Sequence, residues 1–150
     1  MTLNEIPVAT LLGEKKNSVH CTSANSTVYS AVLEMNRLRI GSVLVRDADH
    51  LVGIFTERDV LTRVVAAGLD PKSTLMYTVM TSKVQFISWE ESVEDAMQIM
   101  LEQHIRHLPV FERNQLVGMI SIGDITSWLS KMNEFEAESL RRYIFEGYPS

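Results

Sequence analysis

The sequence has a single cysteine, Cys21, and lacks the features that would place the chain in a membrane or on nucleic acid. One cysteine can form no internal disulfide, which fits a reducing compartment. No apolar run approaches the ~20 residues of a membrane helix, and the first residues lack the basic start and apolar stretch of a signal peptide. The net charge of −5 argues against nucleic acid and anionic membranes as partners. We therefore expect a cytoplasmic protein.

The sequence also has little that would support catalysis or metal binding. It contains no glycine-rich loop for a nucleoside triphosphate. His104 and His107 lie three residues apart, but no further histidine or acid completes a metal-ligand pattern. Cys21 follows His20 in an expected strand, where adjacent side chains point to opposite faces, so the thiol gains no base. We expect no catalytic residue, no metal site and no required cofactor.

What the sequence does contain is an internal repeat. The segment Gly53–Asp59 (GIFTERD) recurs as Gly118–Asp124 (GMISIGD), 65 residues later, and the match continues beyond it without a gap. Other pairs at this spacing are Val28 and Val93, Ala31 and Ala96, Met35 and Met100, Ile40 and Ile105, and Val45 and Val110. A fixed period in a chain this short indicates that one folding unit was duplicated.

Hydrophobic periodicity predicts the same order of elements in both copies. Period-two apolar runs indicate strands, and apolar residues at i, i+3, i+4 and i+7 indicate helices. In the first copy we expect a strand at 19–22, a helix at 27–39, a hairpin of 42–45 and 51–55, and a helix at 57–67. In the second we expect a strand at 84–87, a helix at 92–103, a hairpin of 107–111 and 115–121, and a helix from about 123.

These elements predict an α+β fold of two β-α-β-β-α units, each preceded by a short helical segment, at 8–12 and 75–80. The expected domains are 8–68, 75–132 and a C-terminal helical extension at 133–150. The last helix would run for about 20 residues, past the end of its repeat. It carries a broken apolar stripe of Ile125, Trp128, Leu129, Met132, Phe135, Leu140, Tyr143 and Ile144. Such a stripe packs on a partner subunit or folds back on its own core, and the sequence leaves both open.

Each copy carries Gly-x-x-[Thr/Ser]-x-x-Asp, and this motif has a purely structural interpretation. Thr56 and Ser121 stand at expected helix starts, and each is followed three residues later by an aspartate. This spacing is typical of a capping box, in which the two side chains satisfy the first backbone donors of a helix. On this interpretation Asp59 and Asp124 need no ligand.

The two glycines favour a second interpretation. Gly53 and Gly118 interrupt apolar strands, where glycine often marks the close approach of another backbone or a ligand. A carboxylate at a helix start can accept hydrogen bonds from a vicinal diol such as a ribose, each contributing about 1.5–3 kcal/mol, and the neighbouring hydroxyl can assist. Because the motif occurs twice at one period, we favour ligand binding over capping alone.

These tandem units, each ending in the motif, resemble a pair of CBS domains, the cystathionine β-synthase motif, which together form a Bateman module. The resemblance covers residues 8–129. It implies that the units pack through their sheets about a pseudo-twofold axis and leave two clefts. It also implies that the clefts bind adenosine ligands, namely AMP, ADP, ATP, S-adenosylmethionine or NAD(H).

The resemblance assigns roles to residues by position. The motif aspartate holds the ribose hydroxyls with the help of the threonine or serine. This gives two pairs, Thr56 with Asp59 and Ser121 with Asp124. The adenine pocket of the family uses the strand before the first helix of a unit. Those positions are His20 and Thr22, and Phe86 and Ile87.

The two copies diverge just before the hairpin. Arg106 and His107 stand where the first copy has Gly41 and Ser42. In related modules basic residues here contact phosphates, and arginine offers a planar fork to phosphate oxygens. The alternative is that both are solvated chain ends, with Arg106 favouring a helix C-terminus. Arg58 could reach a phosphate or simply face water. We therefore expect two unequal clefts.

These observations predict a regulatory module that senses adenine nucleotides and signals energy or redox state to a partner. One alternative is an interaction protein with vestigial nucleotide sites. A third possibility is an enzyme that acts on the bound nucleotide. By resemblance alone we expect a homodimer, together with a protein partner that the sequence does not identify.

Overall fold

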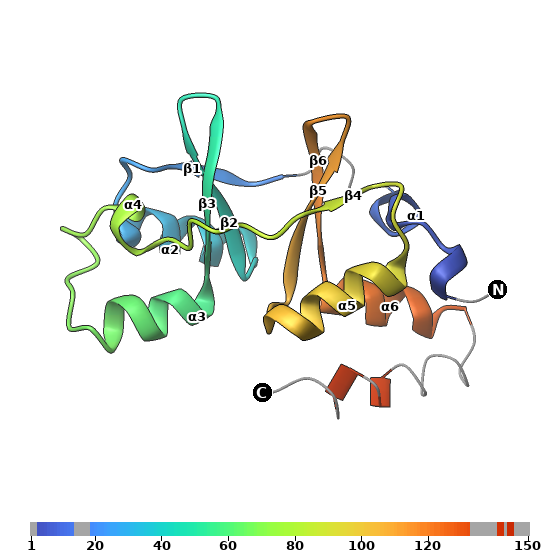
Figure 1. Cartoon of the computed structure of the whole chain (residues 1–150). Coiled ribbons are helices and arrows are strands. Elements are labelled where there is room, and N and C mark those ends of the chain that lie inside the picture. The colour runs from blue at the N-terminus through green and yellow to red at the C-terminus, as the bar shows by residue number, and fades with distance from the viewer. Residues whose placement is uncertain (1–2, 14–18, 133–140, 143, 146–150) are drawn as a thin grey trace. The chain divides into compact units, whose positions relative to one another are not determined.

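The computed structural model describes residues 3–13, 19–132, 141–142 and 144–145 (Figure 1). The chain divides into two compact units. The first-repeat unit is His20–Val84, and the second-repeat unit joins Met1–Val19 to Gln85–Ser150. Each contains one three-stranded sheet with its own helices, as the repeat predicts.

The first-repeat unit contains a sheet in the order β1-β2-β3. Strand β1 runs parallel to β2, and β2 pairs with β3 as an antiparallel hairpin. The elements are β1 (Cys21–Ser23), α2 (Val28–Leu38), β2 (Ser42–Asp47), β3 (His50–Thr56), α3 (Glu57–Asp59), the π-helix η3 (Val60–Val65) and α4 (Met76–Val79). At the open end of the hairpin, Ser42 pairs with Thr56. This end therefore lies beside α3, the helix that begins at the Gly-x-x-[Thr/Ser]-x-x-Asp motif.

The second-repeat unit repeats this topology in its sheet β4-β5-β6. Its elements are η1 (Leu3–Glu5), α1 (Val8–Leu12), β4 (Ile87–Ser88), α5 (Val93–Gln103), β5 (His107–Glu112), β6 (Gln115–Ser121) and α6 (Ile122–Ser130). The pairing of His107 with Ser121 is the 65-residue counterpart of the first hairpin, and both hairpins shift register at equivalent residues. The predicted α+β repeats are therefore confirmed.

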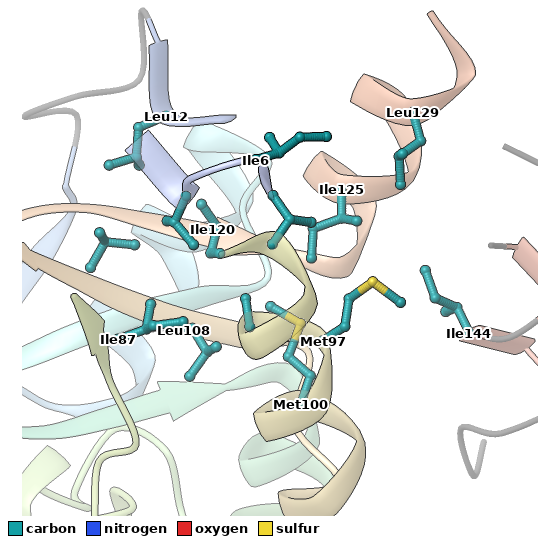
Figure 2. Close-up of a cluster of buried hydrophobic side chains, with 14 of the residues drawn as sticks. Ile6, Leu12, Ile87, Met97, Met100, Leu108, Ile120, Ile125, Leu129 and Ile144 are labelled. Atoms are coloured by element: carbon teal, nitrogen blue, oxygen red, sulfur yellow. The ribbon is translucent and has the colours of Figure 1, made fainter. Parts of the chain in front are cut away.

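Each unit packs its helices on one sheet through an apolar core. In the first, α2 buries Val28, Ala31 and Met35 against strand residues that include Phe55. In the second, α5 buries the corresponding stripe against β5 and β6, and α6 adds Ile125 and Leu129 (Figure 2). The helical period read from the sequence thus identified the buried faces.

Several boundaries differ from the sequence-based expectation. The first strand of each copy lies later than expected and is shorter, at Cys21–Ser23 and Ile87–Ser88. The helix expected at 57–67 is one turn of α-helix followed by wider π-type turns, in which the Ala66 amide donates to the Leu61 carbonyl at 2.9 Å.

The helical segment that precedes each repeat packs on the other repeat. Segment α1 lies in the second-repeat unit, although the sequence grouped it with 8–68. The physical reason is helix capping by the main chain. The Val93 amide at the start of α5 donates to the Ile6 carbonyl at 2.8 Å, and the Val28 amide at the start of α2 donates to the Thr74 carbonyl at 2.9 Å. The residues just before α1 and α4 thereby satisfy helix donors that lack an intrahelical partner.

The strand glycines make room for these docked segments. A Cβ on Gly53 would overlap the Met80 side chain and lie 3.0 Å from the Thr81 carbonyl oxygen. A Cβ on Gly118 would lie 2.6 Å from Leu12. The close approach that the glycines predict is therefore made by the chain itself.

The extended C-terminal helix is not confirmed. Helix α6 ends at Ser130, and Lys131 and Met132 form a turn. Of the predicted extension, residues 133–140, 143 and 146–150 lie outside the described residues. Ile144 is 5% exposed and belongs to the core of the second-repeat unit, as the folded-back interpretation of the stripe predicts (Figure 2).

Among the described residues, no helix combines the length and apolar character that crossing a bilayer requires.

The packing at Gly53 generates a stability prediction. Gly53→Ala should lower the free energy of unfolding by about 1–3 kcal/mol, because the new methyl group must displace Met80 and crowd a backbone oxygen. Urea unfolding followed by circular dichroism measures this. Gly123→Ala is the matched control, since its Cβ would meet nothing closer than the Ser121 hydroxyl at 3.5 Å. Equal stability of the two variants would contradict the packing account.

Candidate functional site

The motif of the first repeat forms a complete capping box. Thr56 is the N-cap of α3, and its hydroxyl oxygen accepts from the Asp59 amide at 3.4 Å. In return, Oδ2 of Asp59 accepts from the Thr56 amide at 2.9 Å. The capping box predicted from the spacing of Thr56 and Asp59 is therefore present.

The second repeat repeats this arrangement. Oδ2 of Asp124 accepts from the Ser121 amide at 2.8 Å, and the Asp124 amide donates to the Ser121 hydroxyl at 3.0 Å. A carboxylate has two oxygens and about four acceptor positions. A capping box that engages Oδ2 therefore does not by itself exclude a ligand.

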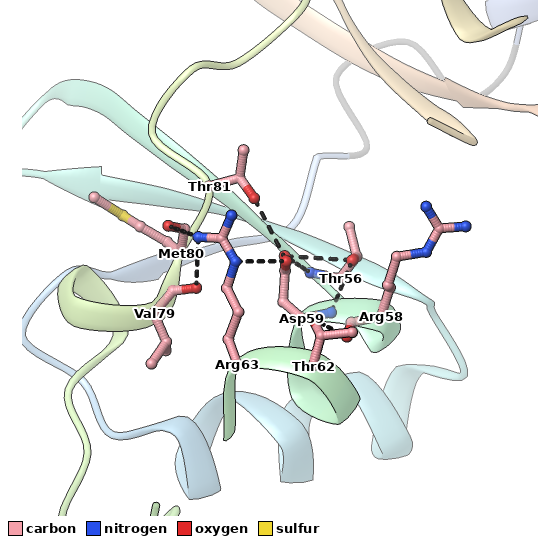
Figure 3. A network of polar contacts seen from close by, with 8 residues as sticks. All are labelled: Thr56, Arg58, Asp59, Thr62, Arg63, Val79, Met80 and Thr81. Carbon is pink, nitrogen blue, oxygen red and sulfur yellow. Dashed lines mark hydrogen bonds and ion pairs between the residues drawn. The ribbon is translucent and has the colours of Figure 1, made fainter. Parts of the chain in front are cut away.

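Asp59 has additional partners from outside its own helix turn. Its Oδ1 lies 3.5 Å from Nε of Arg63 and accepts a long hydrogen bond, also 3.5 Å, from the Thr81 hydroxyl (Figure 3). The same Arg63 donates through one terminal nitrogen to the carbonyls of Val79 at 3.4 Å and Met80 at 3.0 Å. Asp59 is only 7% exposed.

The second repeat differs at the corresponding positions. Trp128 stands 65 residues after Arg63 and packs partly buried against the apolar core. It carries no charge that could pair with Asp124. Asp124 itself is partly exposed, in contrast to the buried Asp59.

The residues expected to contact phosphates lie beside the motif helices. The amide of Ile122, the first residue of α6, donates to the Arg106 carbonyl at 3.0 Å, and the equivalent Glu57 amide donates to the Gly41 carbonyl at 3.0 Å. Ser42 and His107 pair across the hairpins with the motif hydroxyl residues. The structure thus brings together one group of candidates in each unit.

The members of these groups differ in exposure. Arg106 and Arg58 are exposed, and His107 is partly exposed, whereas Ser42 is buried. In Figure 3 the guanidinium of Arg58 points away from Asp59. The basic side chains that could meet a phosphate therefore lie at the surface of each unit.

The expected adenine positions lie in, or directly before, the edge strands β1 and β4. The Leu44 amide donates to the His20 carbonyl at 3.0 Å, and Thr22 pairs with Val45, so both candidates lie two strands from the motif strand β3. In the second unit Phe86 is 62% exposed and makes an edge-to-face contact with Phe111.

Ile87 differs from its neighbour Phe86. Its side chain is 1% exposed and belongs to the apolar core. Ile87 is the first residue of β4, and Phe86 directly precedes the strand. Any side-chain contact with a ligand from this pair would come from Phe86.

Sequence reasoning missed Arg63 and Thr81. Arg63 follows Asp59 by four residues, the spacing at which helical side chains form ion pairs, so this contact could have been found. Thr81 lies 22 residues from Asp59 and left no local signal. Within the described ranges, no group of three or more histidine, cysteine or acidic side chains is arranged to hold a metal ion.

Comparison with known proteins identifies the repeated unit. The CBS domain family model matches residues 15–66 and 76–131. The CBS domain-containing protein CBSX3, mitochondrial, of Arabidopsis thaliana is 36% identical over 133 residues, which cover 85% of this chain and 64% of that protein. CBSCBSPB2 of the same organism is 37% identical over 98 residues, covering 65% of this chain and 18% of that protein. The chain thus spans less than two thirds of either relative.

A solved structure shows the same fold. It comes from Burkholderia ambifaria and is described as a signal-transduction protein with CBS domains. It superposes with a TM-score of 0.80 at 34% identity and covers 85% of this chain and 96% of that one. Proteins with such domain pairs are generally regulatory or signal-transduction modules. With both repeats matched by the family model, the chain belongs to the CBS domain family.

Proposed function

We propose that the chain is a regulatory module that binds an adenosine ligand and passes its binding state to a partner protein, without itself catalysing a reaction. The ligand would be AMP, ATP, NAD(H) or S-adenosylmethionine. A homodimer is the expected assembly. A bound ligand shifts such an equilibrium only by its difference in affinity between two states, typically about 1–3 kcal/mol.

The arrangement around Asp124 carries this proposal. A partly exposed carboxylate stands in the first turn of α6, with the Ser121 hydroxyl beside it and the Arg106 main chain bonded to the same turn. A carboxylate suits the two hydroxyls of a ribose, and an exposed guanidinium suits a phosphate. The carboxylate and the arginine belong to neighbouring positions at the start of α6, and an adenosine phosphate needs partners for both its ribose and its phosphate. Ser121, Asp124, Arg106 and His107 are the proposed binding residues in the second repeat.

The first repeat offers the corresponding set of Thr56, Asp59, Arg58, Gly41 and Ser42. Gly41 and Ser42 stand where the second repeat has the basic residues Arg106 and His107, and the aspartate of the first repeat is buried. The two sites are therefore unequal. His20 and Thr22 in this repeat, and Phe86 in the other, are the proposed adenine contacts.

One observation favours a second candidate function. Both motif aspartates accept hydrogen bonds from their own main chain. If capping is their whole role, the chain is an interaction module with vestigial nucleotide sites. The two candidates differ in what happens when the charge of Asp124 is removed and the capping acceptor is retained.

Asp124→Asn makes that distinction. Asparagine keeps an oxygen for the Ser121 amide but loses the charge, so the affinity for AMP should fall roughly 10- to 100-fold while the free energy of unfolding changes by less than about 1 kcal/mol. Isothermal titration calorimetry and urea unfolding measure the two quantities.

The chain offers a matched control in a third capping box. At the start of α5, Oδ2 of Asp95 accepts from the Ser92 amide at 3.2 Å, and the Asp95 amide donates to the Ser92 hydroxyl at 3.0 Å. Asp95→Asn should alter stability as little as Asp124→Asn does and leave AMP binding unchanged. Equal AMP affinity in both variants would support the vestigial interpretation.

Arg106 tests the phosphate contact. Arg106→Gln should weaken AMP and ATP binding on the order of tenfold and leave adenosine binding unchanged, because only the phosphates need the guanidinium. Arg113→Gln at the far turn of the same hairpin is the control. A parallel loss of adenosine and AMP affinity would refute a phosphate role for Arg106.

A further inference from the structure

Asp59 and Arg63 fasten the segment that links the two repeats to the first-repeat unit. We call Met76–Thr81 the linking segment. Arg63 reaches two of its carbonyls, at Val79 and Met80, and Asp59 receives the hydroxyl of Thr81. The ion pair between Asp59 and Arg63 joins these contacts into one network, which we call the clamp (Figure 3).

We infer that the clamp withdraws Asp59 from ligand binding, so that the chain binds one adenosine ligand, at Asp124. This inference rests on the proposed function. Oδ2 of Asp59 is committed to the Thr56 amide, and Oδ1 is committed to Arg63 and Thr81. With 7% of the residue exposed, a ribose could reach the carboxylate only by displacing these partners.

Displacing them would also disturb the linking segment. Thr81 exchanges two backbone hydrogen bonds with Ile54 of β3, each 2.9 Å, and Met80 fills the space above Gly53. A sugar that took the place of the Thr81 hydroxyl would have to fit beside a residue whose backbone is held by this β-bridge. A ligand that bound at Asp59 would have to displace or strain these contacts, and its affinity would be lower by that free energy.

Both docked segments bury apolar side chains, Met76 and Val79 in the first-repeat unit, but the second-repeat unit has no arginine at the position of Arg63. The α1 segment packs against β6 and α6 through buried Val8 and Leu12, and Trp128 replaces Arg63. Trp128 cannot form an ion pair with a carboxylate as Arg63 does. The inferred difference in role between Asp59 and Asp124 therefore begins with the difference between Arg63 and Trp128 at equivalent positions.

Hydrogen exchange tests the clamp directly. Arg63→Met and Asp59→Asn should each accelerate exchange of the Met80 and Thr81 amides at least about threefold, because both variants weaken the charged contacts that hold the segment. Arg37→Met is the matched control. Arg37 forms an exposed ion pair with Glu34 at 2.6 Å on α2 in the same unit, and its loss should leave those amides unchanged. Unchanged exchange in Arg63→Met would overturn the clamp.

Calorimetry with AMP, ATP, NADH and S-adenosylmethionine tests the assignment of sites. The wild-type chain should bind one equivalent, Asp59→Asn should bind one equivalent with affinity within about threefold, and Asp124→Asn should lose binding roughly tenfold or more. Two equivalents in the wild type, or a tenfold loss in Asp59→Asn, would overturn the inference and leave the proposed function standing. No binding of any probe would refute the proposed function and the one-ligand assignment together, and the exchange experiment would still decide the clamp.

Discussion

The candidate site depends on the capping box at the start of each motif helix. The exchange of hydrogen bonds between Ser121 and Asp124 fixes the carboxylate against the first turn of α6. An acid in this position is favoured by the exposed backbone amides and the dipole of the helix. Capping and the proposed ligand binding are compatible, because a carboxylate whose Oδ2 caps the helix has further acceptor positions. In the first repeat, the aspartate of the same capping box also pairs with Arg63, which donates hydrogen bonds to carbonyls of the linking segment.

The docked segments explain why the two repeats differ. The residues just before each of them supply a carbonyl to the start of a repeat helix, and each lies over a strand glycine, so the backbone geometry of docking is shared. Buried apolar side chains complete it in both repeats. The first repeat adds an arginine that reaches main-chain carbonyls, and the second has a tryptophan at that position. Duplication preserved the fold, and divergence at a few contacts changed which side chains surround each motif aspartate.

Much of the fold could be predicted from sequence because its signals are local and occur twice. The 65-residue period, the apolar stripes and the spacing of Thr56 and Asp59 identified the units, the buried helix faces and the helix caps. Docking of α1 on the second repeat could not be read from periodicity, because it depends on where single carbonyls meet helix ends. For the same reason Thr81, distant in sequence from Asp59, escaped prediction. Phe86 and Ile87 fall in one expected strand, but only the structure shows which one enters the core.

The central claim is that a nucleotide is bound at the start of α6 by a carboxylate that also caps the helix. The most direct measurement is a titration of isotope-labelled chain with AMP, following backbone amide resonances by nuclear magnetic resonance. The account predicts saturable shifts at Ser121, Gly123 and Asp124, with little change at Thr56 and Asp59. Resonances at the start of α6 that stay fixed at saturating AMP, or shifts confined to the first repeat, would contradict it.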